Sequence, residues 1–179
     1  MRVLIAGILG GIAMYVWATA AHLSPLGAAG VKSMPNEAVG LAALNLDLGS
    51  GPGGIYVFPT PSTAKGGPST GSAGMLVYSP HAPLTLSPRQ LIAEFSLEIV
   101  ESLLLAGVAA LVTGGFGARV GAALLVGVIA AVTTNLSYWN WYGFPLDYTL
   151  ATAFTELMKY LVAGVVIALV LGRRRVAAA

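Results

Sequence analysis

The sequence predicts an all-α membrane protein: a four-helix transmembrane bundle with a long outer loop that contains a short helix and a small β-hairpin. The first observation is composition. The chain is 56% hydrophobic and 9% charged, with a mean hydropathy of +0.81, whereas soluble domains are about 25% charged. The second observation is four apolar stretches, each long enough to cross about 30 Å of hydrocarbon. The third is that the last stretch stops at Arg173, Arg174 and Arg175, a basic flank typical of cytoplasmic membrane borders.

The four spans are expected in chain order at residues 1–23, 88–113, 118–137 and 148–172. The first is an apolar run that directly follows Met1 and Arg2. The second has Ser87 as a helix cap and Pro88 in its first turn, a typical helix start. An even number of spans brings the chain back to its starting side, so both termini should lie on the same side of the membrane.

The positive charges predict which side that is. Arg2, Arg119 and the basic tail 173–179 lie at the shared side of the termini, while the short loop 138–147 has no Lys or Arg. Basic residues near span ends favour the cytoplasm. Both termini and the tail are therefore expected in the cytoplasm, and residues 24–87 should form an outer, periplasmic loop.

The outer loop, 24–87, is expected to carry structure of its own. Pro35-Asn36-Glu37 predicts the start of a short helix that ends near Leu46, with proline and an acidic residue in the first turn. Residues 55–58 and 75–78 are rich in β-branched and aromatic side chains and predict an antiparallel strand pair. Two isolated strands are marginally stable, so we expect them to lie on the helices or on another protein.

Ionisable residues inside two of the spans predict an ion pair between helices. Glu94, Glu98 and Glu101 follow spacings of four and three and share one helix face, and Glu156 precedes Lys159 by three residues. Glu101 and Lys159 lie about 18 and 20 Å from the expected cytoplasmic ends of their spans. A charge at the bilayer centre costs about 2.5–3.5 kcal/mol. We therefore expect Lys159 to bond Glu101 or Glu98, with Glu156 pointing toward the outer interface. The cluster could be a proton or cation relay, or a structural latch between helices.

Two further groups of residues are candidate sites. His22 and His81 are the two histidines of the chain. They could ligate a haem iron or a pigment, although a histidine at a helix end more often makes interfacial hydrogen bonds. No metal site and no cofactor are expected, while bound lipid is. An interfacial aromatic belt, alternatively a platform for a ligand or pigment, is predicted at Tyr138, Trp139, Trp141, Tyr142, Phe144 and Tyr148.

Five segments of the chain are distinctive together: GGIAMYVW at 10–17, MPNE at 34–37, GIYVFP at 54–59, SPRQ at 87–90 and, most specifically, SYWNWYGFP at 137–145. With them the chain resembles a family of uncharacterised small bacterial four-span integral membrane proteins. The resemblance covers most of the chain and implies a multi-pass protein of the bacterial inner membrane, with no assigned activity and no catalytic residues.

Three functions fit these features. The first is a non-catalytic accessory or structural subunit of a larger respiratory or photosynthetic type of membrane complex, with lipids and other integral membrane subunits as partners. The second is a small proton- or cation-coupled transporter that uses Glu98, Glu101 and Lys159. The third is a haem or pigment binder through His22. No phosphate-binding glycine loop and no nucleophile beside a base is found, so we do not expect an enzyme. The single basic cluster at the tail gives no reason to expect nucleic acid as a partner.

Overall fold

The computed structural model describes residues 1–49, 51–59, 73–80 and 86–172, which are mostly helical with one two-stranded antiparallel sheet. His81 and the basic tail with Arg173, Arg174 and Arg175 lie outside the described residues. The elements are α1 (Arg2–His22), α2 (Pro25–Ala28), α3 (Glu37–Asp47), β1 (Gly54–Phe58), β2 (Gly74–Tyr78), α4 (Pro88–Leu111), α5 (Phe116–Ala131), the π-helix η1 (Val132–Leu136), α6 (Ser137–Tyr142) and α7 (Leu146–Leu171).

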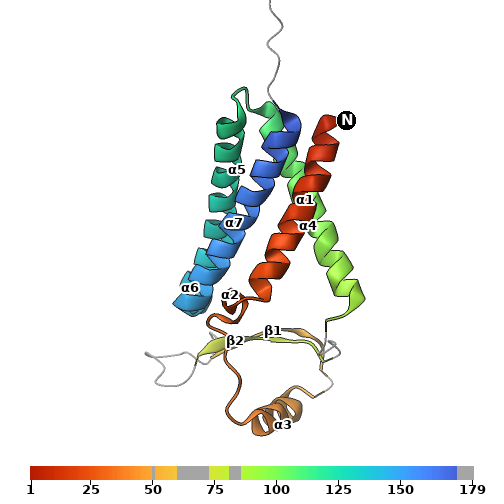
Figure 1. The fold of residues 1–179 in the computed structure, drawn as a ribbon. Coiled ribbons are helices and arrows are strands. Elements are labelled where there is room, and N and C mark those ends of the chain that lie inside the picture. The colour runs from red at the N-terminus through yellow and green to blue at the C-terminus, as the bar shows by residue number, and fades with distance from the viewer. Residues whose placement is uncertain (50, 60–72, 81–85, 173–179) are drawn as a thin grey trace, which may run out of the picture.

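Four long helices, α1, α4, α5 and α7, form a bundle (Figure 1). α1 packs mainly on α4 and α7, and α5 packs mainly on α7. We call the end of the bundle that holds Arg2, Leu111 and Leu171 the tail end. The opposite end, which holds His22 and Pro88, is the loop end. α3 and the two strands lie beyond the loop end (Figure 1).

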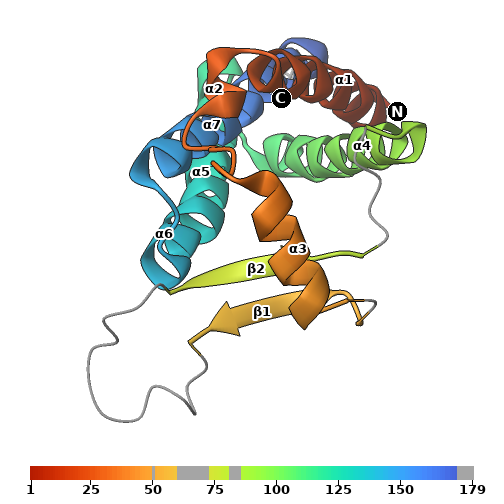
Figure 2. The ribbon, with the colours of Figure 1, turned by 90° about the horizontal axis from the view of Figure 1, so that it is seen from below.

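Glycines allow α1 and α4 to cross in close contact. A Cβ atom added at Gly7 would lie 2.9 Å from the Cα of Leu103, and one added at Gly11 would lie 2.8 Å from the Cα of Ile99. Both distances are too short for a real side chain, so the two backbones touch at this crossing. Small residues permit such close approach of helices in a bilayer, where the hydrophobic effect does not drive helices together. From the crossing, α4 diverges from α5 and α7 toward the loop end (Figures 1 and 2).

The core of the bundle is apolar and built largely from small side chains. Alanines from all four helices are buried together with a few larger residues, so the helices pack closely. The buried cluster consists of Ala6, Met14, Leu105, Ala106, Ala109, Ala123, Tyr160, Ala163 and Ile167. Most of these residues lie in the half of the bundle nearer the tail end.

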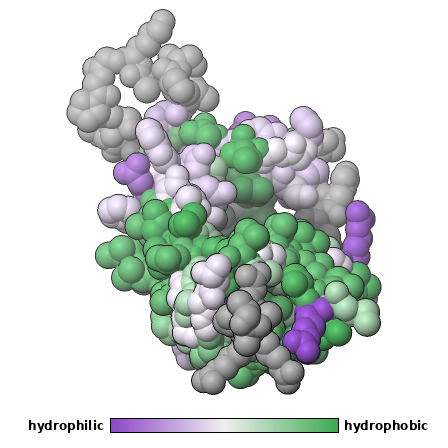
Figure 3. Space-filling model, turned by 90° about the horizontal axis from the view of Figure 1, so that it is seen from above, coloured by the Kyte–Doolittle hydropathy of each residue, from purple (hydrophilic) through white to green (hydrophobic). Residues whose placement is uncertain are grey.

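In the part of the chain that the structure describes, three helical segments are long and apolar enough to cross a membrane by length and composition: Arg2–His22, Phe116–Tyr142 and Leu146–Leu171. In the view from the tail end, hydrophobic residues cover most of the visible bundle surface, and only isolated hydrophilic residues interrupt them (Figure 3). α4 is 24 residues long but carries Glu94, Glu98 and Glu101, and it does not meet the same composition test.

The helix after α4 is longer than the sequence predicts. A span at 118–137 followed by an aromatic loop at 138–147 is wrong, because η1 and α6 continue the helix to Tyr142. The segment SYWNWY contains no helix-breaking residue. The helix ends at Gly143, whose φ of 67° is the left-handed conformation typical of a helix terminus. α7 then begins at Leu146, two residues earlier than expected.

The short helix and the strand pair of the outer loop are confirmed. Ile55 pairs with Val77 and Val57 with Met75, so these four side chains share one face of the sheet. Ile55 is 66% exposed and Val77 is 69% exposed. Within the described residues, neither strand packs extensively against a helix of the bundle. Of the two supports expected for the strands, the helices are not used extensively, because the sheet lies beyond the loop end rather than along the bundle. Packing on another protein stays a prediction.

Candidate functional site

Lys159 is the centre of a group of three carboxylates. Its Nζ lies 2.9 Å from Oε2 of Glu101, 3.3 Å from Oε1 of Glu156 and 3.4 Å from Oε1 of Glu98. The Lys159 side chain is only 10% exposed. Because α7 ends twelve residues later, at Leu171, the cluster lies about 18 Å from the tail end at 1.5 Å per residue. The ammonium is thus held inside the bundle, midway along it.

The carboxylates reach Lys159 from two helices. Glu98 and Glu101 are one turn apart on α4, and Glu98 is 2% exposed. Tyr160 donates a hydrogen bond of 3.5 Å to Oε2 of Glu101. Sequence analysis expected Lys159 to bond Glu101 or Glu98, and the structure places it against both. Glu156 lies one turn before Lys159, nearer the loop end, and also contacts its ammonium group. That it points toward the outer interface stays a prediction.

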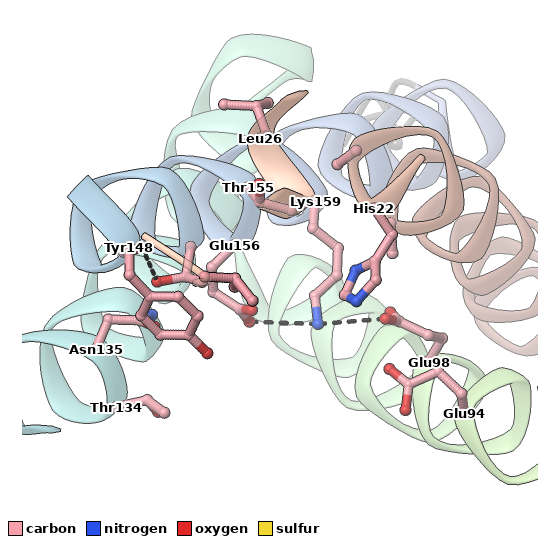
Figure 4. A pocket seen from close by; sticks show the side chains of 15 residues that line it. His22, Leu26, Glu94, Glu98, Thr134, Asn135, Tyr148, Thr155, Glu156 and Lys159 are labelled. Atoms are coloured by element: carbon pink, nitrogen blue, oxygen red, sulfur yellow. Dashed lines mark hydrogen bonds and ion pairs between the residues drawn. The ribbon is translucent and has the colours of Figure 1, made fainter. Parts of the chain in front are cut away.

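A cavity of about 470 Å³ opens beside this cluster toward the loop end. In Figure 4, His22, Glu98, Glu156 and Lys159 point into one space from three helices. Figure 2 shows α4 apart from α5 and α7 at this end of the bundle. The cavity is lined by Ala18, Ala21 and His22 of α1, by Leu26, Gly27 and Val31, by Glu94 and Glu98 of α4, by Thr134 and Asn135 of η1, and by Tyr148, Thr152, Thr155, Glu156 and Lys159 of α7.

The charges around the cavity do not balance. Glu94, Glu98, Glu101 and Glu156 supply four formal negative charges, and Lys159 supplies one positive charge. These five side chains therefore carry a formal net charge of −3, with one ammonium group shared by three of the carboxylates. Oε2 of Glu98 is buried and accepts no hydrogen bond within the described residues. A buried carboxylate oxygen without a donor is unfavourable, so the cavity is suited to a positively charged or proton-donating group.

The helix α1 fixes the wall of the cavity through a polar contact. Trp17 donates a hydrogen bond of 3.0 Å from Nε1 to the backbone carbonyl of Thr155. This bond joins α1 to α7 one turn away from Lys159. The ring of Tyr15 also packs edge-on against Phe95 of α4, with centroids 5.3 Å apart. α1 therefore holds α4 and α7 in register at the depth of the charged cluster.

Several lining residues were missed by sequence analysis. Thr152 and Thr155 were not predicted, and Tyr148 was predicted only as part of the aromatic belt. The three residues precede Lys159 at spacings of four, three and four, which places them on its helix face. This periodic polar pattern could have indicated the cavity. Thr134 and Asn135 lie in the π-helix η1, a deviation that is frequent at functional sites. In the sequence, these two residues belong to a short polar run inside an otherwise apolar helix, which could have indicated a functional position.

The predicted histidine and aromatic sites are only partly in the cavity. His22 lines it and points toward Lys159 and Glu98 (Figure 4), while His81 lies outside the described residues. Among the aromatic residues, Tyr148 lines the cavity. A chain of ring contacts continues from Tyr148 to Phe144, Tyr138 and Tyr142, and Trp139 and Trp141 are exposed at the loop end. The residues of the predicted aromatic belt thus lie together at the loop end, and Tyr148 connects them to the cavity.

Arg119 lies far from the cavity and has a structural contact that sequence analysis missed. The sequence suggested an orientation role, but the residue is buried at the start of α5. Its guanidinium donates to the backbone carbonyl of Gly172, which follows α7. Carbonyl groups at a helix C-terminus lack intrahelical partners and carry partial negative charge. Arg119 therefore ties α5 to the end of α7.

The described residues include no group of three or more His, Cys, Asp or Glu side chains arranged to hold a metal ion. No protein family model, no curated protein and no solved structure matches this chain. The function must therefore be argued from the bundle and its cavity.

Proposed function

We propose that this chain is a non-catalytic membrane protein that binds a small solute in the cavity from the outer side of the membrane. The proposal has three parts: a fourth span formed by α4, the orientation of the bundle, and binding without conduction. It keeps the expectation of an integral protein of the bacterial inner membrane, in agreement with the resemblance described above.

The surface of α4 supports a fourth span. Glu98 and Glu101 contact Lys159 and Glu94 lines the cavity, whereas Arg89 is exposed in the first turn. Large apolar side chains are exposed from Leu91 to Leu111. A soluble helix has the reverse arrangement, with its apolar stripe facing the core. Charged residues within membrane spans normally face the bundle interior and pair with one another. The exposed apolar residues of α4 are Leu91, Ile92, Phe95, Leu97, Val100, Leu104, Val108 and Leu111.

The charge distribution supports an orientation with the tail end in the cytoplasm. Arg2 begins α1 and Arg119 lies near the start of α5, both at the tail end. Arg173, Arg174 and Arg175 follow α7 directly in the sequence. Basic residues near span ends favour the cytoplasmic side. The loop end and the cavity mouth would then face the periplasm.

The observation that carries the binding proposal is the contrast between the two halves of the bundle. The half toward the loop end holds the polar cavity. The half toward the tail end is filled by the packed core of Leu105, Ala106, Ala109, Ala163 and Ile167. An ion or proton path needs polar groups or water at membrane depth, and this core supplies a barrier instead. The arrangement therefore favours capture of a solute at one face over conduction through the bundle.

Cysteine accessibility tests the proposal directly, because the chain has no native cysteine. Thr152→Cys places a thiol on the cavity wall, and Ala163→Cys places one in the packed core. In intact cells, a membrane-impermeant thiol reagent should modify the first variant and leave the second unmodified. Modification of Ala163→Cys from either side would contradict a one-sided binding site and favour the transporter hypothesis. An unreactive Thr152→Cys would contradict an outward-open cavity.

The strand pair supports a second candidate, the accessory subunit of a larger membrane complex. Ile55, Val57 and Val77 are exposed on one face of a sheet that does not pack extensively on the bundle. Two strands alone are marginally stable, so a partner subunit would complete this region. Co-migration with a larger assembly after purification in mild detergent, lost on Ile55→Asp and Val77→Asp substitution, would support it. Migration of the wild type as a free protein would contradict it.

A further inference from the structure

We infer that the cavity binds a small aliphatic molecule with two ammonium groups. This inference rests on the proposed solute-binding function and adds the chemical class of the solute. It is argued from the charge balance, the position of Glu98, the spacing of the carboxylates and the apolar part of the lining.

The charge balance demands more than one positive charge. Three carboxylates share one lysine and Glu94 lines the cavity beside them, which gives these five side chains a formal net charge of −3. The cluster lies midway along a bundle that we place in the membrane, where uncompensated charge is costly. A ligand with one positive charge would leave two formal negative charges uncompensated. A ligand with two ammonium groups removes most of the imbalance.

Glu98 defines where the first ammonium group would lie. Its Oε1 is 3.4 Å from Nζ of Lys159, and its buried Oε2 has no hydrogen-bond partner within the described residues. The residue is 2% exposed and lines the cavity. This oxygen has almost no accessible surface, so the carboxylate must first rotate to turn it toward the cavity. An ammonium group, which donates up to three hydrogen bonds, can then bond it and still contact a second acceptor. A quaternary ammonium group has no N–H and could not.

Glu94 and Glu156 define the position of the second group. Glu94 precedes Glu98 by one helical turn, which separates their Cβ atoms by about 6 Å toward the cavity mouth. Glu156 faces the same space from α7 (Figure 4). Ala18, Ala21 and Leu26 supply apolar surface to the same cavity. Carboxylates at two positions and apolar surface in the same cavity match two ammonium groups joined by a short methylene chain.

The shape of the site argues against a bare metal ion. Calcium takes six to eight oxygen ligands close around one point, and the described residues hold no cluster of carboxylates and histidines of that kind. The cavity of about 470 Å³ is instead of the size that accommodates small organic ligands. A linear diamine fits both the volume and the distribution of charge.

The test is calorimetric titration of the purified full-length protein in lipid nanodiscs with 1,4-diaminobutane. Butylamine has the same carbon chain and one ammonium group, and it serves as the matched control ligand. We expect one diamine per chain and at least tenfold weaker binding of butylamine. Glu98→Gln and Glu156→Gln should each weaken diamine binding at least tenfold. Glu37→Gln, an exposed substitution on α3, should leave it unchanged.

Several outcomes would overturn the inference. These are equal affinity for diamine and butylamine, unchanged diamine binding in Glu98→Gln, or saturation of the site by sodium or calcium chloride in place of the diamine. Retained helical circular dichroism in each variant excludes misfolding as the cause of lost binding. If Thr152→Cys is labelled from outside but no amine binds, the ligand class is wrong and the solute-binding proposal stands. If Thr152→Cys is unreactive and no amine binds, both fail.

Discussion

Replacement of Lys159 by methionine should destabilise the bundle through the carboxylate that it leaves behind. Methionine retains much of the length and apolar volume of lysine but removes the ammonium group that contacts Glu98, Glu101 and Glu156. The three carboxylates differ in whether another group can replace the lost contact with the ammonium group. Glu156 is 28% exposed and lines the cavity, so water can replace its lost contact, and Glu101 keeps the hydrogen bond from Tyr160. The Glu98 side chain is 2% exposed and has no such replacement.

Glu98 therefore determines how much stability the Lys159→Met variant loses. Removing one partner of a buried ion pair costs about 3–5 kcal/mol, because the other charge stays buried without compensation. We expect Lys159→Met to lower the free energy of unfolding by about 3 kcal/mol, the lower end of that range, since the cavity admits some water to the cluster. The double variant Lys159→Met/Glu98→Gln removes the stranded charge as well. It should recover roughly 2 kcal/mol of the loss, a coupling typical of residues in one network.

The assay is reversible unfolding in mixed micelles with increasing sodium dodecyl sulfate, followed by helical circular dichroism. Glu101→Gln is the matched control, because it changes a partly exposed carboxylate in the same cluster and should have a smaller effect than Lys159→Met. A loss below about 0.5 kcal/mol for Lys159→Met would match an exposed ion pair rather than a buried one. That result, or a double variant no more stable than Lys159→Met, would refute the reasoning.

Three further predictions follow from contacts elsewhere in the bundle. Gly11→Ala should lower the free energy of unfolding by about 1–3 kcal/mol, because the added Cβ meets the α4 backbone. Gly121 faces open space, so Gly121→Ala should be neutral or stabilising by up to about 1 kcal/mol in the same unfolding assay. Equal effects of the two would argue against the close crossing of α1 and α4. Arg119→Met should accelerate hydrogen exchange over the last turn of α7, since the buried guanidinium binds the carbonyl that follows that helix; unchanged exchange there would contradict this capping role. Trp17→Phe removes the hydrogen bond from α1 to the α7 backbone. It should lower the free energy of unfolding by about 1 kcal/mol and speed thiol labelling of a cysteine placed on the cavity wall. Wild-type stability and labelling would show that the bond does not hold the wall in place.

Local sequence patterns predicted the elements and the composition of the charged cluster well. Spacings of three and four placed the acidic residues of α4 on one face, and counting residues from the helix ends placed Lys159 at a similar depth. The contact of Lys159 with Glu98 and Glu101 follows from those two facts together with the cost of an unpaired charge in a membrane. The strand pair was likewise predictable from short runs of β-branched and aromatic residues.

The cavity could not be predicted in this way, because it depends on how the helices cross. Gly7 and Gly11 fix the crossing of α1 and α4 through contacts with Leu103 and Ile99, and no local pattern specifies those partners. The divergence of α4 that follows from this crossing opens the space beside Lys159. The π-helix η1, which turns Thr134 and Asn135 to that space, is also a tertiary outcome of packing against α7. Residues that face a cavity and residues that face a neighbouring helix have the same periodicity, so sequence alone does not separate them.

The central claim is that α4 crosses the membrane with its acidic face turned to Lys159, and the most direct test is the location of its two ends. Leu86→Cys lies just before α4 and Thr113→Cys just after it, and both positions are exposed. In intact cells, an impermeant thiol reagent should label Leu86→Cys, while Thr113→Cys should react only after the cells are lysed. Labelling of both variants in intact cells, or of neither before lysis, would place both ends of α4 on one side and contradict the account.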